Sequence, residues 1–196
     1  MKIVHLIAGI ALSATPSLAE ETTQLDAHEH GVGQLNIAFD ENKVAMELHA
    51  PGADIVGFEY GAKSDVDLAA IDAALQTLSD PLGLFLLPEA ASCIVITAHA
   101  KLESEDSDHD DHDEEGHDDH DDEGHDGHDE APGHTEFHAE YLLECANLTE
   151  MSAITFSYFE IFPNALELEV QVISDKGATA FEIERDVAKL DLRGIF

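Results

Sequence analysis

Six histidines lie within residues 106–130, a stretch that otherwise consists almost entirely of Asp, Glu and Gly. They form three His-x-x-His pairs with an eight-residue period: His109 and His112, His117 and His120, and His125 and His128. Neutral imidazole is a good ligand for zinc, nickel or copper, and two imidazoles three positions apart can reach one ion. Neighbouring carboxylates can accept the second ring N–H of each histidine and so fix its tautomer. The spacing therefore predicts that this stretch binds divalent metal ions.

The composition of the stretch limits how tightly it can bind. It has no side chains with which to build a core, and acidic low-complexity runs are most often solvated and unstructured. Ordering such a chain around an ion costs roughly 1–2 kcal/mol per residue fixed. We therefore expect residues 104–133 to be a disordered insert with several weak and poorly selective sites, which gathers metal ions rather than holding them.

A second group of histidines lies in segments that are predicted to fold. His28 and His30 are two positions apart, so on an extended strand their side chains point the same way. The apolar rows of residues 35–39 and 44–48 predict a hairpin register in which His49 lies on the same polar face. This predicts a three-histidine metal site that is partly preorganised by the sheet, with Glu29 or Glu59 as outer groups. In the alternative, the N-terminal pair belongs to a frayed segment and His49 is simply exposed.

Three further histidines flank the insert. His134 follows it directly and is the better candidate for an additional metal ligand. His99 and His138 lie on the strands predicted before and after the insert. If the two cysteines are bonded across an antiparallel pair of these strands, His99 lies opposite Ala139. That register puts His99 and His138 on opposite faces unless a bulge intervenes, and whether either histidine joins a site stays open.

The elements that must position these residues begin with a β-hairpin. Two apolar rows alternate with polar or small residues on either side of a short polar segment: Leu35, Ile37 and Phe39, then Val44, Met46 and Leu48. Both rows face one side only if Phe39 opposes Val44 and Leu35 opposes Leu48, which leaves residues 41–42 as a two-residue turn. A slip by one residue would expose one of the rows.

One helix and several further strands follow the hairpin. Residues 64–80 carry apolar side chains at helical spacing, with Ser64 as the N-cap and Pro81 beyond the end. Residues 82–91 are interpreted as a linking loop. Strands are predicted at residues 92–102, 137–146, 153–159, 165–174, 178–184 and 188–192. The predicted fold class is α+β: a mainly antiparallel β-sheet with one principal helix and the disordered insert between two strands.

Residues 1–19 are typical of a secretory signal peptide. Lys2 precedes an apolar run over residues 3–12, and Ser-Leu-Ala at residues 17–19 fits a small-x-small cleavage site. A buried N-terminal strand or helix is the alternative. The run is too short to span a bilayer, and no other segment is long and apolar enough. We therefore expect a periplasmic protein that is not an integral membrane protein.

Charge and cysteine content narrow the choice of partners. The chain has 43 acidic and 8 basic residues, which gives a formal net charge of −35. Such a surface repels nucleic acid and attracts cations, so we expect no nucleic-acid binding. Cys93 and Cys145 are most simply a disulfide in an oxidising compartment, with two metal-binding thiolates or two unrelated thiols as alternatives. The length suits one α+β metal-binding domain, formed by residues 20–103 and 134–196.

These residues carry a resemblance to a known family. The relevant parts are AHEHGVGQLNIAFDENKVAMELHAPGADIVGFEY over residues 27–60, the following helix, the His/Asp insert between strands and FHAEYLLEC over residues 137–145. They resemble the ZrgA-type periplasmic zinc-uptake proteins over nearly the whole chain after residue 19. The resemblance implies a zinc-binding component that works with an inner-membrane uptake system. It places His28 and His30 in the family's N-terminal histidine motif and makes the insert its His-rich loop.

The observations together predict a periplasmic protein that captures zinc (Zn²⁺) and passes it to an inner-membrane metal transporter. A nickel or copper buffer, or a metal-storage protein without a transport role, is the main alternative, because imidazole affinity rises from zinc to copper. A zinc-dependent hydrolase is a weaker alternative, since the chain has no H-E-x-x-H helix and no nucleophile elbow. We therefore expect a protein that is not an enzyme.

Overall fold

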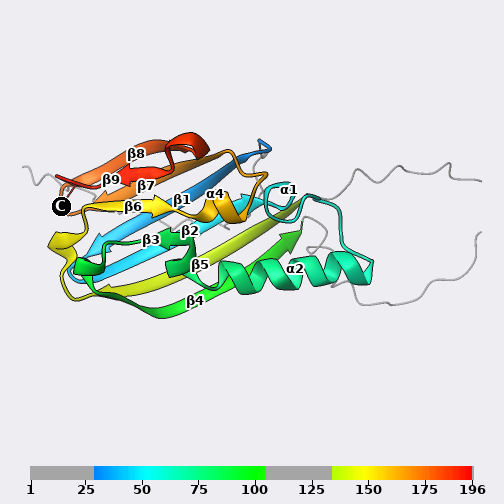
Figure 1. The fold of residues 1–196 in the computed structure, drawn as a ribbon, viewed down its shortest axis with the longest axis horizontal. Coiled ribbons are helices and arrows are strands. Elements are labelled where there is room, and N and C mark those ends of the chain that lie inside the picture. Colours follow the sequence, from blue (N-terminus) through cyan, green and yellow to red (C-terminus); the bar gives the residue numbers. More distant parts are fainter. Residues whose placement is uncertain (1–28, 105–133, 196) are drawn as a thin grey trace, which may run out of the picture.

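The computed structural model describes residues 29–104 and 134–195, whose strands form two sheets (Figure 1). The larger sheet has six strands in the order β4-β5-β2-β1-β7-β8. They are β1 (Val32–Asp40), β2 (Lys43–Pro51), β4 (Cys93–Ser104), β5 (Thr135–Cys145), β7 (Glu167–Ser174) and β8 (Gly177–Glu184). All neighbours are antiparallel except β1 and β7, which are parallel. The described part is thus mostly β structure with mainly antiparallel pairing, as predicted.

A second layer covers one face of this sheet (Figure 1). It contains a smaller sheet in the order β3-β6-β9 and the longest helix of the described residues. Its elements are β3 (Phe85–Leu86), β6 (Ala153–Phe156), β9 (Lys189–Asp191) and α2 (Asp65–Leu78). The core lies between the layers, where Phe85 of β3 packs edge-on against Tyr141 of β5 with ring centroids 6.1 Å apart. The opposite face of the large sheet carries the polar rows of its strands.

The β1–β2 hairpin has the predicted register. Phe39 pairs with Val44 and Leu35 with Leu48, so residues 41–42 form the turn. The apolar rows of both strands are buried, because this is the register that turns both rows toward the core. The residues between them on β2, including Glu47 and His49, consequently face away from the core.

Helix α2 begins after Ser64, as predicted. Fewer of its apolar side chains are buried than its composition suggests. The Ser64 hydroxyl accepts a hydrogen bond from the backbone N–H of Asp67 at 3.1 Å. This contact satisfies one of the amides that the first helical turn leaves without a partner. Ile71, Ala74 and Leu78 are the buried residues of the helix.

The expectation of one principal helix is not confirmed, because the described residues contain four α-helices. The other three have four residues each: α1 (Gly52–Ile55), α3 (Pro81–Leu84) and α4 (Tyr158–Ile161). The interpretation of residues 82–91 as a loop is wrong, since they include most of α3, all of β3 and a short 3-10 helix. The strand predicted at residues 153–159 ends at Phe156, where the chain turns into α4. Apolar runs this short show no clear period, so they could not be assigned from the sequence.

A buried hydrogen bond attaches α2 to the large sheet and provides a test of this packing. The Tyr141 hydroxyl donates to the Leu78 carbonyl at 2.7 Å. Tyr141→Phe leaves that carbonyl without its donor, so we expect the free energy of unfolding to fall by about 1 kcal/mol. Urea unfolding followed by circular dichroism measures the change. Tyr60→Phe is the matched control, because Tyr60 is exposed, and equal effects of the two substitutions would contradict the assigned role.

Strands β4 and β5 are joined by the Cys93–Cys145 disulfide, which confirms the predicted bridge. The register beyond it differs from the expectation. A β-bulge between Val95 and Thr97 inserts one residue into β4, so His99 pairs with Glu140. The predicted pairing of His99 with Ala139 is therefore wrong, and His99 faces the same side of the sheet as His138. A single inserted residue reverses which face every later side chain of the strand occupies.

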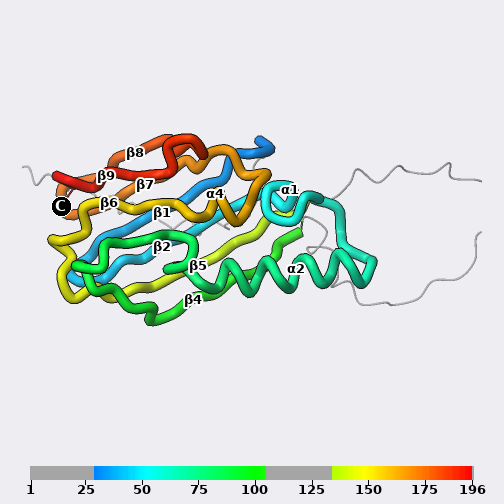
Figure 2. Tube along the Cα trace, in the orientation of Figure 1, coloured from blue at the N-terminus to red at the C-terminus, as the bar shows by residue number. Residues whose placement is uncertain are grey.

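One end of the large sheet gathers several segments that are distant in sequence. The start of β1, the loop around α1, the end of β4 and the start of β5 all lie there (Figure 2). The predicted signal peptide at residues 1–19 and residues 105–133 of the predicted insert lie outside the described residues. Within the described parts of the chain, no helix is long and apolar enough to cross a membrane.

Candidate metal centre

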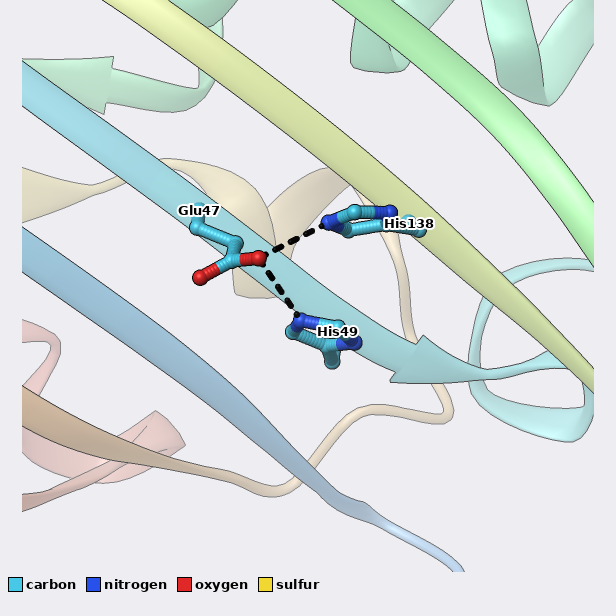
Figure 3. Close-up of side chains that lie close together, drawn as sticks. All are labelled: Glu47, His49 and His138. Carbon is cyan, nitrogen blue, oxygen red and sulfur yellow. Dashed lines mark hydrogen bonds and ion pairs between the residues drawn. The ribbon is translucent and has the colours of Figure 1, made fainter. Parts of the chain in front are cut away.

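Three side chains converge on the outer face of the large sheet: Glu47, His49 and His138 (Figure 3). Glu47 and His49 are two positions apart on β2, so they share a face. His138 lies on β5 directly across from His49. One potential ligand atom from each residue lies within 4.8 Å of those of the other two. The cross-strand pair and the alternation along β2 therefore build a compact group from two adjacent strands.

The geometry of the group suits a divalent ion. The Nε2 atoms of His138 and His49 lie 3.1 Å and 3.4 Å from the same oxygen, Oε1 of Glu47. The two imidazole rings are stacked, with centroids 4.4 Å apart and planes inclined by 19°. Two imidazole nitrogens and one carboxylate oxygen are a common ligand set for zinc, and three protein ligands leave a fourth position open for water or exchange.

Carboxylates also face the outer nitrogen of each ring. Nδ1 of His49 lies 3.4 Å from Oε2 of the buried Glu136. Nδ1 of His138 lies 3.8 Å from Oε1 of Glu103. An Nδ1–H that faces a carboxylate leaves the lone pair on Nε2, which is the atom directed at Glu47. The surroundings thus orient both rings with Nε2 toward the common point.

The electrostatics of the group favour a cation. The hydrogen bond to Glu136 raises the pKa of His49, although burial opposes the shift. Burial would raise the pKa of Glu47, but hydrogen bonds with His138, Asn36 and His49 outweigh it and lower that pKa. Glu47 is consequently ionised at neutral pH, and the carboxylates around the two rings attract positive charge.

The histidines singled out from the sequence fall into separate groups. His30 lies 3.0 Å from Glu59 through Nε2, and His134 lies 3.0 Å from the same carboxylate oxygen through Nδ1. His49 instead contacts Glu47 and Glu136 and stacks on His138. The polar alternation of β1 does not extend back to His30, because the strand begins at Val32 and Gly31 has a φ of 90°.

Other predicted ligands are not placed by the structure. His28 and the six histidines of the insert lie outside the described residues, so their roles stay predictions. His99 is exposed on β4. From the sequence, the role of His138 stays open, and Glu47 is not among the predicted ligands. Glu47 and His49 are two positions apart in a predicted strand, so the sequence alone indicates that they share a face. No feature of the sequence indicates that β5 lies beside β2.

A six-stranded sheet that presents a two-histidine, one-carboxylate group on its outer face defines a candidate metal-binding protein. The family model of the ZrgA family zinc uptake proteins matches residues 27–192. The match covers most of the chain, which therefore belongs to this family, as the sequence resemblance predicted. No curated protein matches the chain.

Proposed function

We propose that the protein captures zinc in the periplasm and passes it to an inner-membrane uptake system. The convergence of Glu47, His49 and His138 is the observation that carries this proposal. Membership of a zinc uptake family favours zinc as the ion. The acidic composition supports capture of a dication, because the chain carries a formal net charge of −35.

The position of the group suits reversible binding. Two ligands come from adjacent positions across the β2–β5 pair, so little chain has to be ordered when the ion arrives. The group lies on the sheet face that points away from the core, and three protein ligands leave a position through which an acceptor can approach. A site with these properties holds an ion and can still release it.

The insert supports the same role as a collector of ions. Residues 105–133 contain six histidines among many acids, and we propose that they bind zinc weakly and in several copies. His28 is proposed as a further ligand near the N-terminal end. We propose that a signal peptide at residues 1–19 exports the protein to the periplasm, where the insert and the folded group both meet zinc.

The test is zinc binding by variants of the folded group. The background is the chain from residue 20 to 196 in which the six insert histidines are replaced by Asn; we call it the insert-silent variant. Within it, His49→Asn, His138→Asn and Glu47→Gln each remove one of three ligands. We expect each to weaken zinc binding by at least about 10- to 100-fold, because replacing residues that only orient metal ligands already costs that much affinity.

Competition with a chromophoric chelator measures the dissociation constant. His99→Asn is the matched control, since His99 is an exposed histidine on the same face of the sheet. The proposal fails if the three ligand variants bind zinc as tightly as the control. Nickel and copper titrations of the same proteins decide whether the site holds those ions in preference to zinc.

A further inference from the structure

A second group of metal-ligating side chains lies at the end of the large sheet where β4 stops and β5 begins. It consists of His30, Glu59 and His134. We propose that these residues form a second zinc site, separate from the Glu47–His49–His138 group, which exchanges its ion faster. The inference rests on the proposed zinc-binding function and adds a second ion to it.

In one respect the geometry resembles that of the first group, although among the described residues only the first group has all three ligand atoms within 4.8 Å of one another. Oε2 of Glu59 lies 3.0 Å from Nε2 of His30 and 3.0 Å from Nδ1 of His134. One carboxylate oxygen again stands between two imidazole nitrogens. A zinc ion at this point would have two nitrogen ligands, one oxygen ligand and an open fourth position.

The turn that carries His30 is held by a buried carboxylate. The N–H of Gly31 donates to Oδ1 of Asp54 at 2.8 Å, and Asp54 is buried in α1. The N–H of Val32 donates to the carbonyl of Glu29 at 3.1 Å, which closes the turn around His30. The backbone of this ligand is therefore positioned before any ion binds.

Close packing around Gly52 brings the other two ligands together. A Cβ atom at this position would lie 2.3 Å from Oγ1 of Thr135 and 2.7 Å from the carbonyl oxygen of Phe58. Only glycine allows this approach of the backbone segments. Phe58 and Thr135 are the chain neighbours of Glu59 and His134, so the contact places the two ligands side by side.

The two groups differ in exposure and share no residue. The side chains of His30 and His134 are 67% and 52% exposed, against 28% and 10% for His49 and His138. Exposed side chains lose more conformational freedom when an ion fixes them, and we expect about tenfold weaker binding than in the first group. Open access for water and competing ligands also makes release faster.

The insert is joined to the folded domain directly before His134 of the second site. His134 directly follows residue 133, and the six histidines of the insert lie between residues 109 and 128. Along the chain, these histidines are 6 to 25 residues from His134. The other end of the insert follows β4, whose Glu103 faces His138, so both groups lie close to the insert along the chain.

Zinc titration of the insert-silent variant tests the inference. We expect two ions per chain, with dissociation constants that differ by about tenfold. The double variant His30→Asn with His134→Asn should lose the weaker ion and keep the tighter one. Glu59→Gln is a milder substitution and should weaken only the second site. His99→Asn should leave both ions, and rapid mixing with a chelator should show a fast release phase that the double variant lacks.

The outcomes separate this inference from the proposed function. The second site is wrong if the double variant and Glu59→Gln retain two ions and the fast phase. It is also wrong if the insert-silent variant binds one ion that His49→Asn with His138→Asn removes, in which case the proposed function stands. If the one ion is instead removed by the His30 and His134 substitutions alone, the second site stands and the first fails. Equal urea midpoints of the variants confirm that the fold is retained.

Discussion

Replacing Cys93 and Cys145 by alanine is expected to lower the free energy of unfolding by about 4 kcal/mol. The two cysteines are 52 residues apart, and the bridge closes the loop that includes residues 105–133. In the chain-entropy account, the bridge removes conformations of the unfolded chain, and the effect grows with loop length. A loss of this size corresponds to roughly a thousandfold change in the unfolding equilibrium.

Urea unfolding of the oxidised protein and the double alanine variant measures the effect. Deleting residues 105–133 from both proteins is the matched control. The shorter loop should reduce the contribution of the bridge by only about 0.7 kcal/mol, because loop entropy depends on the logarithm of length. Equal stability of the oxidised protein and the alanine variant would contradict the prediction.

The bridge should have little effect on zinc affinity while the protein is folded. His138 lies toward the other end of β5, and its partner strand β2 pairs with β5 over residues 136–144. These backbone hydrogen bonds hold the ligand pair without the disulfide. The alanine variant is therefore expected to bind zinc normally at low temperature and to lose it on unfolding.

Zinc binding at the Glu47–His49–His138 group is expected to collapse on mild acidification. A histidine binds zinc only as the neutral ring, and the reference pKa of the His49 side chain is about 6.5. Below the pKa of His49, a proton competes with the ion for that ring, so the affinity should fall by at least about tenfold per pH unit. Zinc affinity of the insert-silent variant, measured between pH 5 and pH 8, tests this slope.

The direction of the pKa shift of His49 determines the pH at which zinc affinity begins to fall. The hydrogen bond to Glu136 raises the pKa of His49. A histidine with a raised pKa keeps its proton to a higher pH, so competition with zinc should start above pH 6.5. Glu136→Gln removes the negative partner, and the acid limb of the profile should then move to lower pH. Glu140→Gln is the control, since that carboxylate is exposed and lies 4.0 Å from His138.

Each affinity is compared with its own value at pH 8, so that a general loss of binding is separated from a change in proton competition. If zinc affinity depends on pH in the same way in the Glu136 variant, the Glu140 variant and the parent protein, Glu136 does not set the pKa of His49. The intact insert should release its zinc at a higher pH than the folded group, because the dense negative charge around its histidines favours the protonated rings.

Several local elements could be predicted because their signals span few residues. The two apolar rows of the first hairpin allow one register, and the structure has Phe39 opposite Val44. Ser64 marks the start of α2 through a hydrogen bond made within three residues. The bridge between β4 and β5 could be predicted for a different reason, because two cysteines most simply pair in an oxidising compartment even when 52 residues separate them. The same hairpin register predicts that His49 lies on the outward face, which is where the metal group lies.

The partners of His49 were decided only by the tertiary structure. Alternation along a strand tells which way a side chain faces, but it does not tell which strand lies alongside. His49 meets Glu136, 87 residues later, because β5 lies between β2 and β4 when the apolar faces of six strands are covered together. The bulge after Val95 and the turn at Gly31 each interrupt the alternation of inward-facing and outward-facing side chains. The pattern of polar residues in the sequence does not reveal either interruption. Ligand types and spacing are therefore local properties of this sequence, whereas the meeting of ligands follows from long-range burial of the whole sheet.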